Sequence, residues 1–330
     1  MKKSDFRIVF MGTPEFAVAS LDKLRLEGYT IAAVVTAPDK PAGRGKKLQA
    51  SAIKQYAEAN GLKVLQPEKL KDEAFLAELR SLQADLHVVV AFRMLPEMVW
   101  GMPKKGTINL HASLLPQYRG AAPINRAVMN GETVTGATTF FLTHEIDTGL
   151  IIAQVKLPIG FTENAGELHD RMMIAGADLL AETVERIMNN TYKAISQTPD
   201  DGSENKLKPA PKLFKEDCLI NWNLPGLTIY NQIRGLSPYP TAYTVIQGKG
   251  METYQLKIFS STFEPAETDK EAAPKLPSPG TVIIEDRKSM RIATIDGWIS
   301  VKEVQQAGRK HMSVGDYLRG LPNCSDLTAN

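Results

Sequence analysis

The feature that most constrains the fold is an alternation of apolar runs and amphipathic stretches in the first half of the chain. Four short runs rich in Val, Ile and Leu have the length and composition of buried strands. These runs are Arg7–Met11, Ile31–Thr36, Lys63–Leu65 and Leu86–Ala91. Helical patterns separate them at Ala17–Glu27, Ser51–Asn60 and Glu73–Leu82. The alternation predicts an α/β fold with a Rossmann-like, mostly parallel sheet that carries helices on both faces.

The same pattern continues towards the middle of the chain. Gly106–Leu110, Gly136–Leu142 and Leu150–Leu157 predict three more strands, and Glu167–Asn189 predicts a long amphipathic helix. Gly12 follows the first strand, but the second and third glycines of a dinucleotide-binding fingerprint are absent. We therefore interpret this position as a βα turn without a pyrophosphate site.

The second half of the chain has a different character. Short alternating stretches joined by turn residues predict a small β-barrel. They are Thr241–Ile246, Gln255–Ser260, Gly280–Ile284, Met290–Thr294 and Trp298–Val301. A polar, turn-forming run at Gln197–Asn205 precedes them. We predict a first domain at residues 1–190, a linker at 191–207 and a barrel domain at 208–330.

Composition limits the possible functions. The net charge is only +2, so any surface that binds nucleic acid must be local. Cys218 and Cys324 are the only cysteines, too few for a disulfide framework or a cysteine-based zinc site. No apolar run approaches the length of a membrane span, and we expect a cytoplasmic protein without a membrane partner.

Asn109 and His111 are the first candidates for chemistry. They lie two residues apart at the end of a predicted strand, so both side chains point to the same face. An acyl-transfer site needs a hydrogen-bond donor for the developing oxyanion and a group that handles protons near neutral pH. The simpler alternative is an asparagine in a turn and a histidine with a structural role.

The segment Asn109–Pro116 resembles the signature of the formyltransferases that use 10-formyltetrahydrofolate. The resemblance continues through Gln117–Ile124 and reaches Asp147-Thr148-Gly149, where that family carries its catalytic aspartate. Upstream, Phe10–Phe16 and Pro38–Leu48 resemble the branch of the family that acts on methionyl-tRNA. The four motifs stand in the right order over nearly the whole chain.

The resemblance implies a function in translation initiation, with initiator methionyl-tRNA as acceptor and 10-formyltetrahydrofolate as co-substrate, in a monomer without a metal. It implies that the barrel is OB-like and binds tRNA. The implied catalytic residues are Asn109, His111 and Asp147. The implied folate-binding residues are Ser113, Leu114, Leu115, Pro116 and Phe92. The sequence departs from the family's usual pattern at Phe92–Pro96 and at His144–Glu145.

A cluster of cations in the segment Asp39–Lys47 is the candidate tRNA contact. The cluster contains Lys40, Arg44, Lys46 and Lys47, with glycines on both sides of Arg44. These side chains could contact phosphates, and the guanidinium could also reach a base edge. The alternative is a solvated basic loop.

Two other functions remain open from the sequence. One is formylation of a small amine, such as glycinamide ribonucleotide or an aminosugar nucleotide. The other is a non-catalytic RNA-binding protein on the same scaffold. The remaining histidines do not have the spacing of metal ligands, so we interpret them as structural or solvated. They are His87, His144, His169 and His311.

Overall fold

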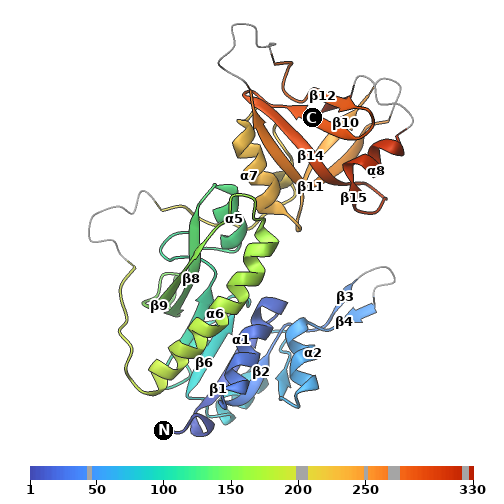
Figure 1. The fold of residues 1–330 in the computed structure, drawn as a ribbon. Helices are drawn as coiled ribbons and strands as arrows, with labels where there is room; N and C mark the ends of the chain where they lie inside the picture. Colours follow the sequence, from blue (N-terminus) through green and yellow to red (C-terminus); the bar gives the residue numbers. More distant parts are fainter. Residues whose placement is uncertain (43–46, 198–206, 249–251, 267–275, 322–326) are drawn as a thin grey trace. The chain divides into compact units, whose positions relative to one another are not determined.

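The structure is a computed structural model that describes residues 1–42, 47–197, 207–248, 252–266, 276–321 and 327–330. The chain forms two compact units, each assembled from three segments (Figure 1). The first unit contains Met1–Gly120, Val134–Pro158 and His169–Ala210. The second contains Ala121–Thr133, Ile159–Leu168 and Pro211–Asn330. Most of the predicted linker, residues 198–206, lies outside the described chain.

A seven-stranded sheet forms the centre of the first unit, in the order β5-β2-β1-β6-β7-β8-β9. Its strands are β1 (Arg7–Gly12), β2 (Thr30–Val35), β5 (Val64–Leu65), β6 (Leu86–Val90), β7 (Thr107–His111), β8 (Val134–Phe141) and β9 (Ile151–Pro158). The first five pair in parallel, whereas β8 and β9 are antiparallel to their neighbours. The predicted mostly parallel sheet is therefore confirmed.

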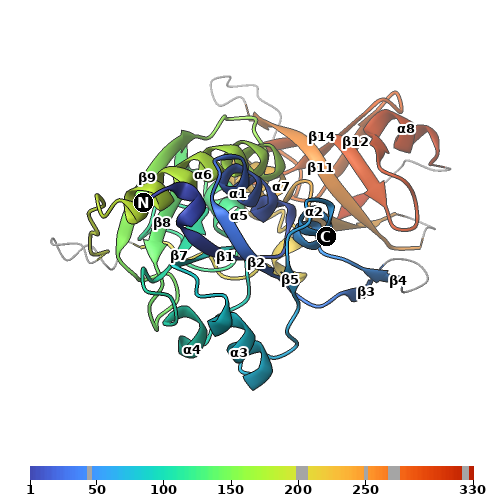
Figure 2. The same cartoon turned by 90° about the horizontal axis from the view of Figure 1, so that it is seen from below.

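Helices cover both faces of this sheet (Figure 2). One face carries α1 (Glu15–Leu26) and α6 (Ala165–Met188), with α2 (Ala52–Ala59) beside α1. The other face carries α3 (Glu73–Ser81) and α4 (Glu97–Trp100). A short 3-10 helix, η1 (Lys3–Asp5), precedes β1. Burial of apolar side chains between α3, α4 and the sheet supplies much of the driving force for this layer.

The turn after β1 shows why a glycine is needed there. A Cβ atom at Gly12 would lie 2.6 Å from the Cβ of Ala17 and 3.0 Å from the carbonyl oxygen of Val90. The glycine thus allows α1 to approach β1 and β6 closely. Pro14 is the N-cap of α1, and its carbonyl oxygen accepts a hydrogen bond from the Ala17 backbone.

The basic segment after β2 contains regular structure that the sequence pattern did not predict. β3 (Lys40–Ala42) and β4 (Lys47–Gln49) form an antiparallel pair with Pro41 opposite Leu48. The predicted contacts Arg44 and Lys46 lie between these strands, outside the residues that the structure describes. We refer to this antiparallel pair as the β3–β4 hairpin.

The second unit is built on an antiparallel, barrel-like sheet in the order β12-β13-β14-β11-β10-β16, with β15 paired to β14. Its strands are β10 (Ala242–Gln247), β11 (Tyr254–Pro265), β12 (Val282–Glu285), β13 (Ser289–Ala293), β14 (Gly297–Gln306), β15 (Met312–Ser313) and β16 (Thr328–Ala329). A backbone bridge between Thr281 and Thr328 joins the two ends of the sheet, so the barrel nearly closes. The predicted small barrel is confirmed.

Three helices of the second unit were not predicted. They are α5 (Pro123–Met129), α7 (Gly226–Leu236) and α8 (Val314–Arg319), and a 3-10 helix, η3 (Glu216–Cys218), precedes α7. Within this unit α5 packs on α7, where the Asn125 side chain donates a hydrogen bond to the Gly235 carbonyl oxygen at 2.8 Å. Every helix among the described residues is too short or too polar to span a bilayer.

Candidate active site

Strand β7 carries the first two candidate residues. It lies between β6 and β8 in the sheet, and Ile108 and Leu110 are both buried on the face opposite to Asn109 and His111. Asn109 is half-buried, whereas His111, the last residue of the strand, is only 6% exposed. Because the strand alternates regularly, Asn109 and His111 share one face, as the sequence predicts.

Each nitrogen of the His111 ring faces an oxygen atom. Its Nε2 lies 2.8 Å from the carbonyl oxygen of Tyr118, and its Nδ1 lies 3.8 Å from Oδ2 of Asp147. A carbonyl oxygen can only accept, so Nε2 carries the hydrogen of that bond. This assignment leaves Nδ1, which faces the carboxylate, as the ring atom that can take up or release a proton.

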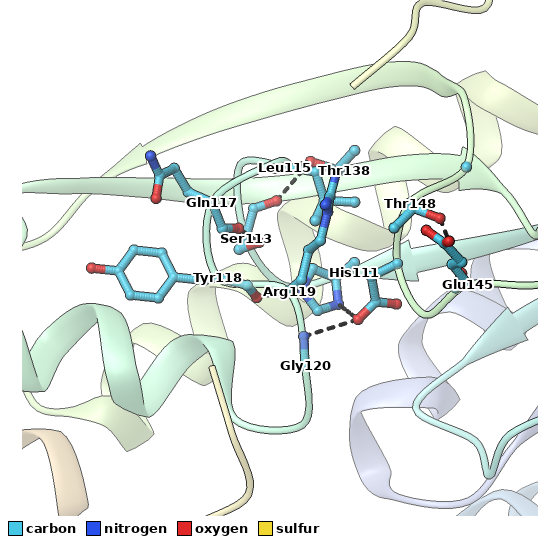
Figure 3. A network of polar contacts seen from close by, with 12 residues as sticks. His111, Ser113, Leu115, Gln117, Tyr118, Arg119, Gly120, Thr138, Glu145 and Thr148 are labelled. Carbon is cyan, nitrogen blue, oxygen red and sulfur yellow. Dashed lines mark hydrogen bonds and ion pairs between the residues drawn. The ribbon is translucent and has the colours of Figure 1, made fainter. Parts of the chain in front are cut away.

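Asp147 lies in the loop between β8 and β9 and adopts a left-handed backbone with φ of 56°. Its Oδ2 accepts a hydrogen bond of 3.0 Å from the Gly120 backbone nitrogen, so one carboxylate oxygen faces both Gly120 and His111 (Figure 3). Gly120 itself has φ of 126°, and a Cβ there would lie 2.4 Å from the carbonyl oxygen of Ala210. Only glycine fits this position without strain.

The loop after β7 is fixed to the neighbouring strands by its own polar groups. Ser113 is fully buried, and its hydroxyl donates to the Gln117 carbonyl oxygen at 2.6 Å. The Thr138 hydroxyl donates to the Ser113 carbonyl oxygen and accepts from the Leu115 backbone nitrogen, at 2.6 and 3.1 Å. The Gln154 amide donates to the Leu115 carbonyl oxygen at 2.9 Å. These bonds shape a rigid loop at the carboxyl edge of the parallel strands.

The other candidate folate contacts are partly accessible. Leu114 and Pro116 in this loop are half-buried, as is Phe92, which follows β6 and packs against the cluster between the sheet and α3. The Arg93 guanidinium lies 5.7 Å from the centre of the Phe92 ring and donates to the Glu68 carbonyl oxygen at 2.9 Å. Folate contact by these residues stays a prediction.

Two polar residues that the sequence analysis gave no role lie next to the pair. Gln197, the first residue of the run interpreted as a linker, is buried in the first unit, and Arg119 donates two hydrogen bonds to its side chain. The Gln197 amide in turn bonds the backbone of Asp147. Arg119 stands inside the recognised motif, but no sequence signal pointed to Gln197.

Two of the four candidate tRNA contacts, Lys40 and Lys47, lie in the strands β3 and β4. Lys40 in β3 is exposed, and Lys47 begins β4. The base of the hairpin is anchored by Asp39, whose carboxylate accepts hydrogen bonds from Lys54 at 2.6 Å and Gln66 at 2.8 Å. These bonds lower the pKa of Asp39, with Lys54 as the main cause. Binding of tRNA by the hairpin remains a prediction.

The remaining histidines have structural or surface positions. Burial lowers the pKa of His87 to about 4. His144 lies 3.5 Å from a Glu97 carboxylate oxygen on the surface, and the His311 ring stacks on Phe259. Among the described residues, no group of three or more His, Cys, Asp or Glu side chains could hold a metal ion.

Comparison with known proteins extends these observations. Residues 6–184 match the family described as formyl transferase, and residues 212–322 match its C-terminal domain. A methionyl-tRNA formyltransferase of Bacteroides thetaiotaomicron is 54% identical over 97% of both chains. The enzyme of that name from Parabacteroides distasonis is 52% identical over 99% of both. The chain therefore belongs to the formyltransferase family, in the branch of the methionyl-tRNA formyltransferases.

Solved structures share the fold at lower identity. An N-formyltransferase from Helicobacter canadensis, in complex with folinic acid and dTDP-3-aminofucose, matches with a TM-score of 0.62 and 22% identity, over 90% of this chain and 98% of that one. HypX from Aquifex aeolicus, in complex with tetrahydrofolic acid, matches with a TM-score of 0.60 and 17% identity, over 94% of this chain and 46% of that one. At these identities the likeness concerns the fold alone.

Proposed function

We propose that the protein transfers the formyl group of 10-formyltetrahydrofolate to the amino group of methionine on initiator methionyl-tRNA. The observation that carries the proposal is the 3.8 Å approach of His111 Nδ1 and Asp147 Oδ2, beside Asn109. It occurs in a chain that is 54% identical, over almost its whole length, to a methionyl-tRNA formyltransferase. We assign the activity to a cytoplasmic monomer.

The reaction begins when the neutral methionine amine attacks the formyl carbon. A new C–N bond forms, and the electron pair of the carbonyl double bond moves to oxygen, which becomes an oxyanion. The Asn109 amide donates a hydrogen bond to this oxygen, and removal of one such donor in other enzymes costs roughly 2.7–4 kcal/mol of transition-state stabilisation. The amine is itself a good nucleophile, so no covalent enzyme intermediate is needed.

Proton transfer then completes the reaction. The attacking nitrogen, now positively charged, gives a proton to Asp147 directly or through one water molecule. The tetrahedral intermediate collapses, the carbonyl double bond reforms, and the bond to N10 of the folate breaks while N10 takes up the proton that Asp147 accepted. His111 Nδ1 takes up and releases protons at the reacting atoms. When it is protonated, it stabilises the oxyanion. The products are formylmethionyl-tRNA and tetrahydrofolate.

The same proposal assigns the residues that bind folate and tRNA. The Ser113–Pro116 loop and Phe92 hold the folate, and the barrel of the second unit binds tRNA. The cations Lys40, Arg44, Lys46 and Lys47 contact the tRNA near its acceptor end, where phosphates attract them. An aminosugar nucleotide is the competing acceptor, and it rests on a fold likeness of 22% identity alone.

A direct assay separates the two acceptors. Protein is incubated with 10-formyltetrahydrofolate and either charged initiator tRNA or an aminosugar nucleotide, and formylated product is followed by chromatography. Rapid appearance of formylmethionine on tRNA, with slow transfer to the nucleotide, is expected. The reverse preference would overturn the proposal.

A further inference from the structure

We infer that Gln197 is a positioning residue that holds the catalytic aspartate in place. It is 5% exposed, and its Nε2 donates hydrogen bonds to the carbonyl oxygens of Asp147 at 3.0 Å and Gly149 at 2.7 Å. Asp147 has a left-handed backbone, which is uncommon for a residue with a side chain. The two bonds fix this conformation and with it the direction of the carboxylate.

The opposite end of the Gln197 amide is fixed by an arginine. Nε and Nη2 of Arg119 donate hydrogen bonds to Oε1 of Gln197 at 3.0 and 2.7 Å. A guanidinium has donors only, so the amide oxygen must face Arg119 and the NH₂ group must face the two carbonyl oxygens. Gln197 is therefore held in one orientation, in which every contact is a donor meeting an acceptor.

Arg119 also connects this contact to the histidine. Its neighbour Tyr118 accepts the bond from His111 Nε2, and its other neighbour Gly120 donates to Asp147 Oδ2 (Figure 3). Tyr118 and Gly120 thus hold the ring and the carboxylate through their backbone, while the side chain of Arg119, which lies between them in the sequence, reaches the Asp147 backbone through Gln197. Together these contacts connect both members of the His111–Asp147 pair to Arg119 and its two neighbours.

The segment that carries Gln197 is itself attached to the sheet. Ile195 forms two backbone hydrogen bonds with Ile151, the first residue of β9, each 2.8 Å long. A residue two positions after such a pair has little freedom to move. Gln197 therefore connects the edge of the sheet to the β8–β9 loop and holds the loop backbone in place.

This inference rests on the proposed function, because it assigns Gln197 a role in formyl transfer. Displacement of a catalytic group by about 1 Å can cost on the order of 100-fold in rate. We therefore expect Gln197→Ala to lower kcat by roughly 10- to 100-fold, with KM for tRNA and folate changed less than about two-fold. The split between kcat and KM distinguishes positioning from binding.

Gln232→Ala is the matched control. The Gln232 amide also bridges two backbone carbonyl oxygens, those of Asp217 at 3.0 Å and Leu219 at 3.1 Å, but in the second unit. The control removes the same side chain and the same type of bonds. We expect kcat at saturating tRNA to stay within about two-fold of wild type, while chemical denaturation reports the stability loss of both variants.

Double-mutant kinetics test whether Gln197 acts through Asp147. In the Asp147→Ala background, Gln197→Ala should lower kcat by less than about two-fold further, because the group that it positions is already gone. Gln197→Glu should be at least as slow as Gln197→Ala. The glutamate keeps an acceptor for Arg119 but turns an oxygen, not a donor, towards the two carbonyls.

Crystal structures supply a readout that does not depend on activity. In Gln197→Ala, Asp147 should leave the left-handed region and its Oδ2 should move away from His111. If the variant does not fold, Arg119→Lys serves instead, because lysine cannot donate the paired bonds that orient the amide. An unmoved Asp147, or full additivity with Asp147→Ala, would overturn the inference. An inactive wild type would refute the proposed function only, since the structural readout remains.

Discussion

Two histidines on neighbouring strands show how differently the two ends of the parallel strands are used. We call these ends the amino edge and the carboxyl edge of the sheet. His87 lies near the start of β6, and His111 ends β7. The His87 ring contacts the Val99 backbone, its Nδ1 has no hydrogen-bond partner among the described residues, and burial lowers its pKa to about 4. The His111 ring, almost equally buried, faces an acceptor at each nitrogen.

The difference lies in what surrounds each end of the strands. At the amino edge, packing converts a histidine into a neutral core residue. At the carboxyl edge, the loop after β7 places the Tyr118 carbonyl oxygen beside His111, and the β8–β9 loop places the Asp147 carboxylate there. Open α/β sheets bind ligands at this edge because the loops there differ freely without disturbing the core.

The largest effect is expected from the proposed catalytic groups at the carboxyl edge. Asn109→Ala should lower kcat by about 10²- to 10³-fold, because it removes an oxyanion donor, and Asp147→Ala should be at least as slow. Since both act in one transition state, the double variant should cost far less than the product of the single losses. Steady-state kinetics with initiator methionyl-tRNA measure this, with circular dichroism as the check on folding. Near-wild-type turnover of Asp147→Ala would remove the proposed role.

A smaller loss is expected when the loop that supports Asp147 is changed. In Gly120→Ala, the new Cβ would meet the Ala210 carbonyl oxygen at 2.4 Å, and the backbone φ of 126° would be strained. The Gly120 backbone must shift and weaken its bond to the carboxylate, so kcat should fall by roughly 10-fold or more and stability by about 1–3 kcal/mol. Kinetics and urea denaturation of the same sample report both. A fully active Gly120→Ala would show that this bond is dispensable.

At the amino edge, a change in stability is expected instead of a change in rate. The folded-state pKa of His87 is about 4, against an ordinary value of 6.5, so the unfolded chain binds a proton that the folded one excludes between these values. The contribution of neutral His87 to stability is complete above pH 6.5 and is lost as pH falls towards 4. The loss approaches about 3 kcal/mol.

His87→Leu is the variant that tests this linkage. It removes the titrating ring, so the free energy of unfolding should depend less on pH between 4 and 6.5 than in wild type. Denaturant titrations at several pH values measure the slope. An unchanged slope would mean that other groups cause the acid sensitivity.

The smallest effects are expected beyond the carboxyl edge of β2, in the hairpin. Neutralising Lys46 or Lys47 should weaken binding about equally for any tRNA and reduce the salt slope by roughly one unit or less each. Arg44→Ala should instead reduce the preference for initiator over elongator methionyl-tRNA, because a guanidinium can pair with a base edge. Relative formylation of the two tRNAs at fixed salt is the measurement. An unchanged ratio would make Arg44 one more phosphate contact.

Much of the first unit could be predicted because its strands are continuous apolar runs that only a buried sheet accommodates. The shared face of Asn109 and His111 followed from strand geometry alone. Helix α7 was missed because its apolar residues form a short run that begins directly after Pro225 and contains glycine. The arms of the β3–β4 hairpin were missed because their lysine and proline residues have low strand propensity.

The contact between His111 and Asp147 could not be derived from the residues alone. It depends on the left-handed conformation of Asp147 and on the close approach at Gly120, both of which are set by loops that meet only in the folded unit. Gln197 was hidden for the same reason. Its polar, turn-rich neighbours have the composition of a linker, and nothing local reveals that its side chain is buried.

Single-turnover formyl transfer by His111→Ala and His87→Leu, at saturating folate and initiator methionyl-tRNA, tests the central claim most directly. Each variant removes one imidazole, and the two imidazoles lie on adjacent strands of one sheet. The variants differ chiefly in position, because His111 lies at the carboxyl edge and His87 at the amino edge. The account predicts a rate for His111→Ala at least about 100-fold below wild type and a rate for His87→Leu close to wild type. Equal losses in the two variants, or a His111→Ala enzyme that transfers formyl at the wild-type rate, would contradict it.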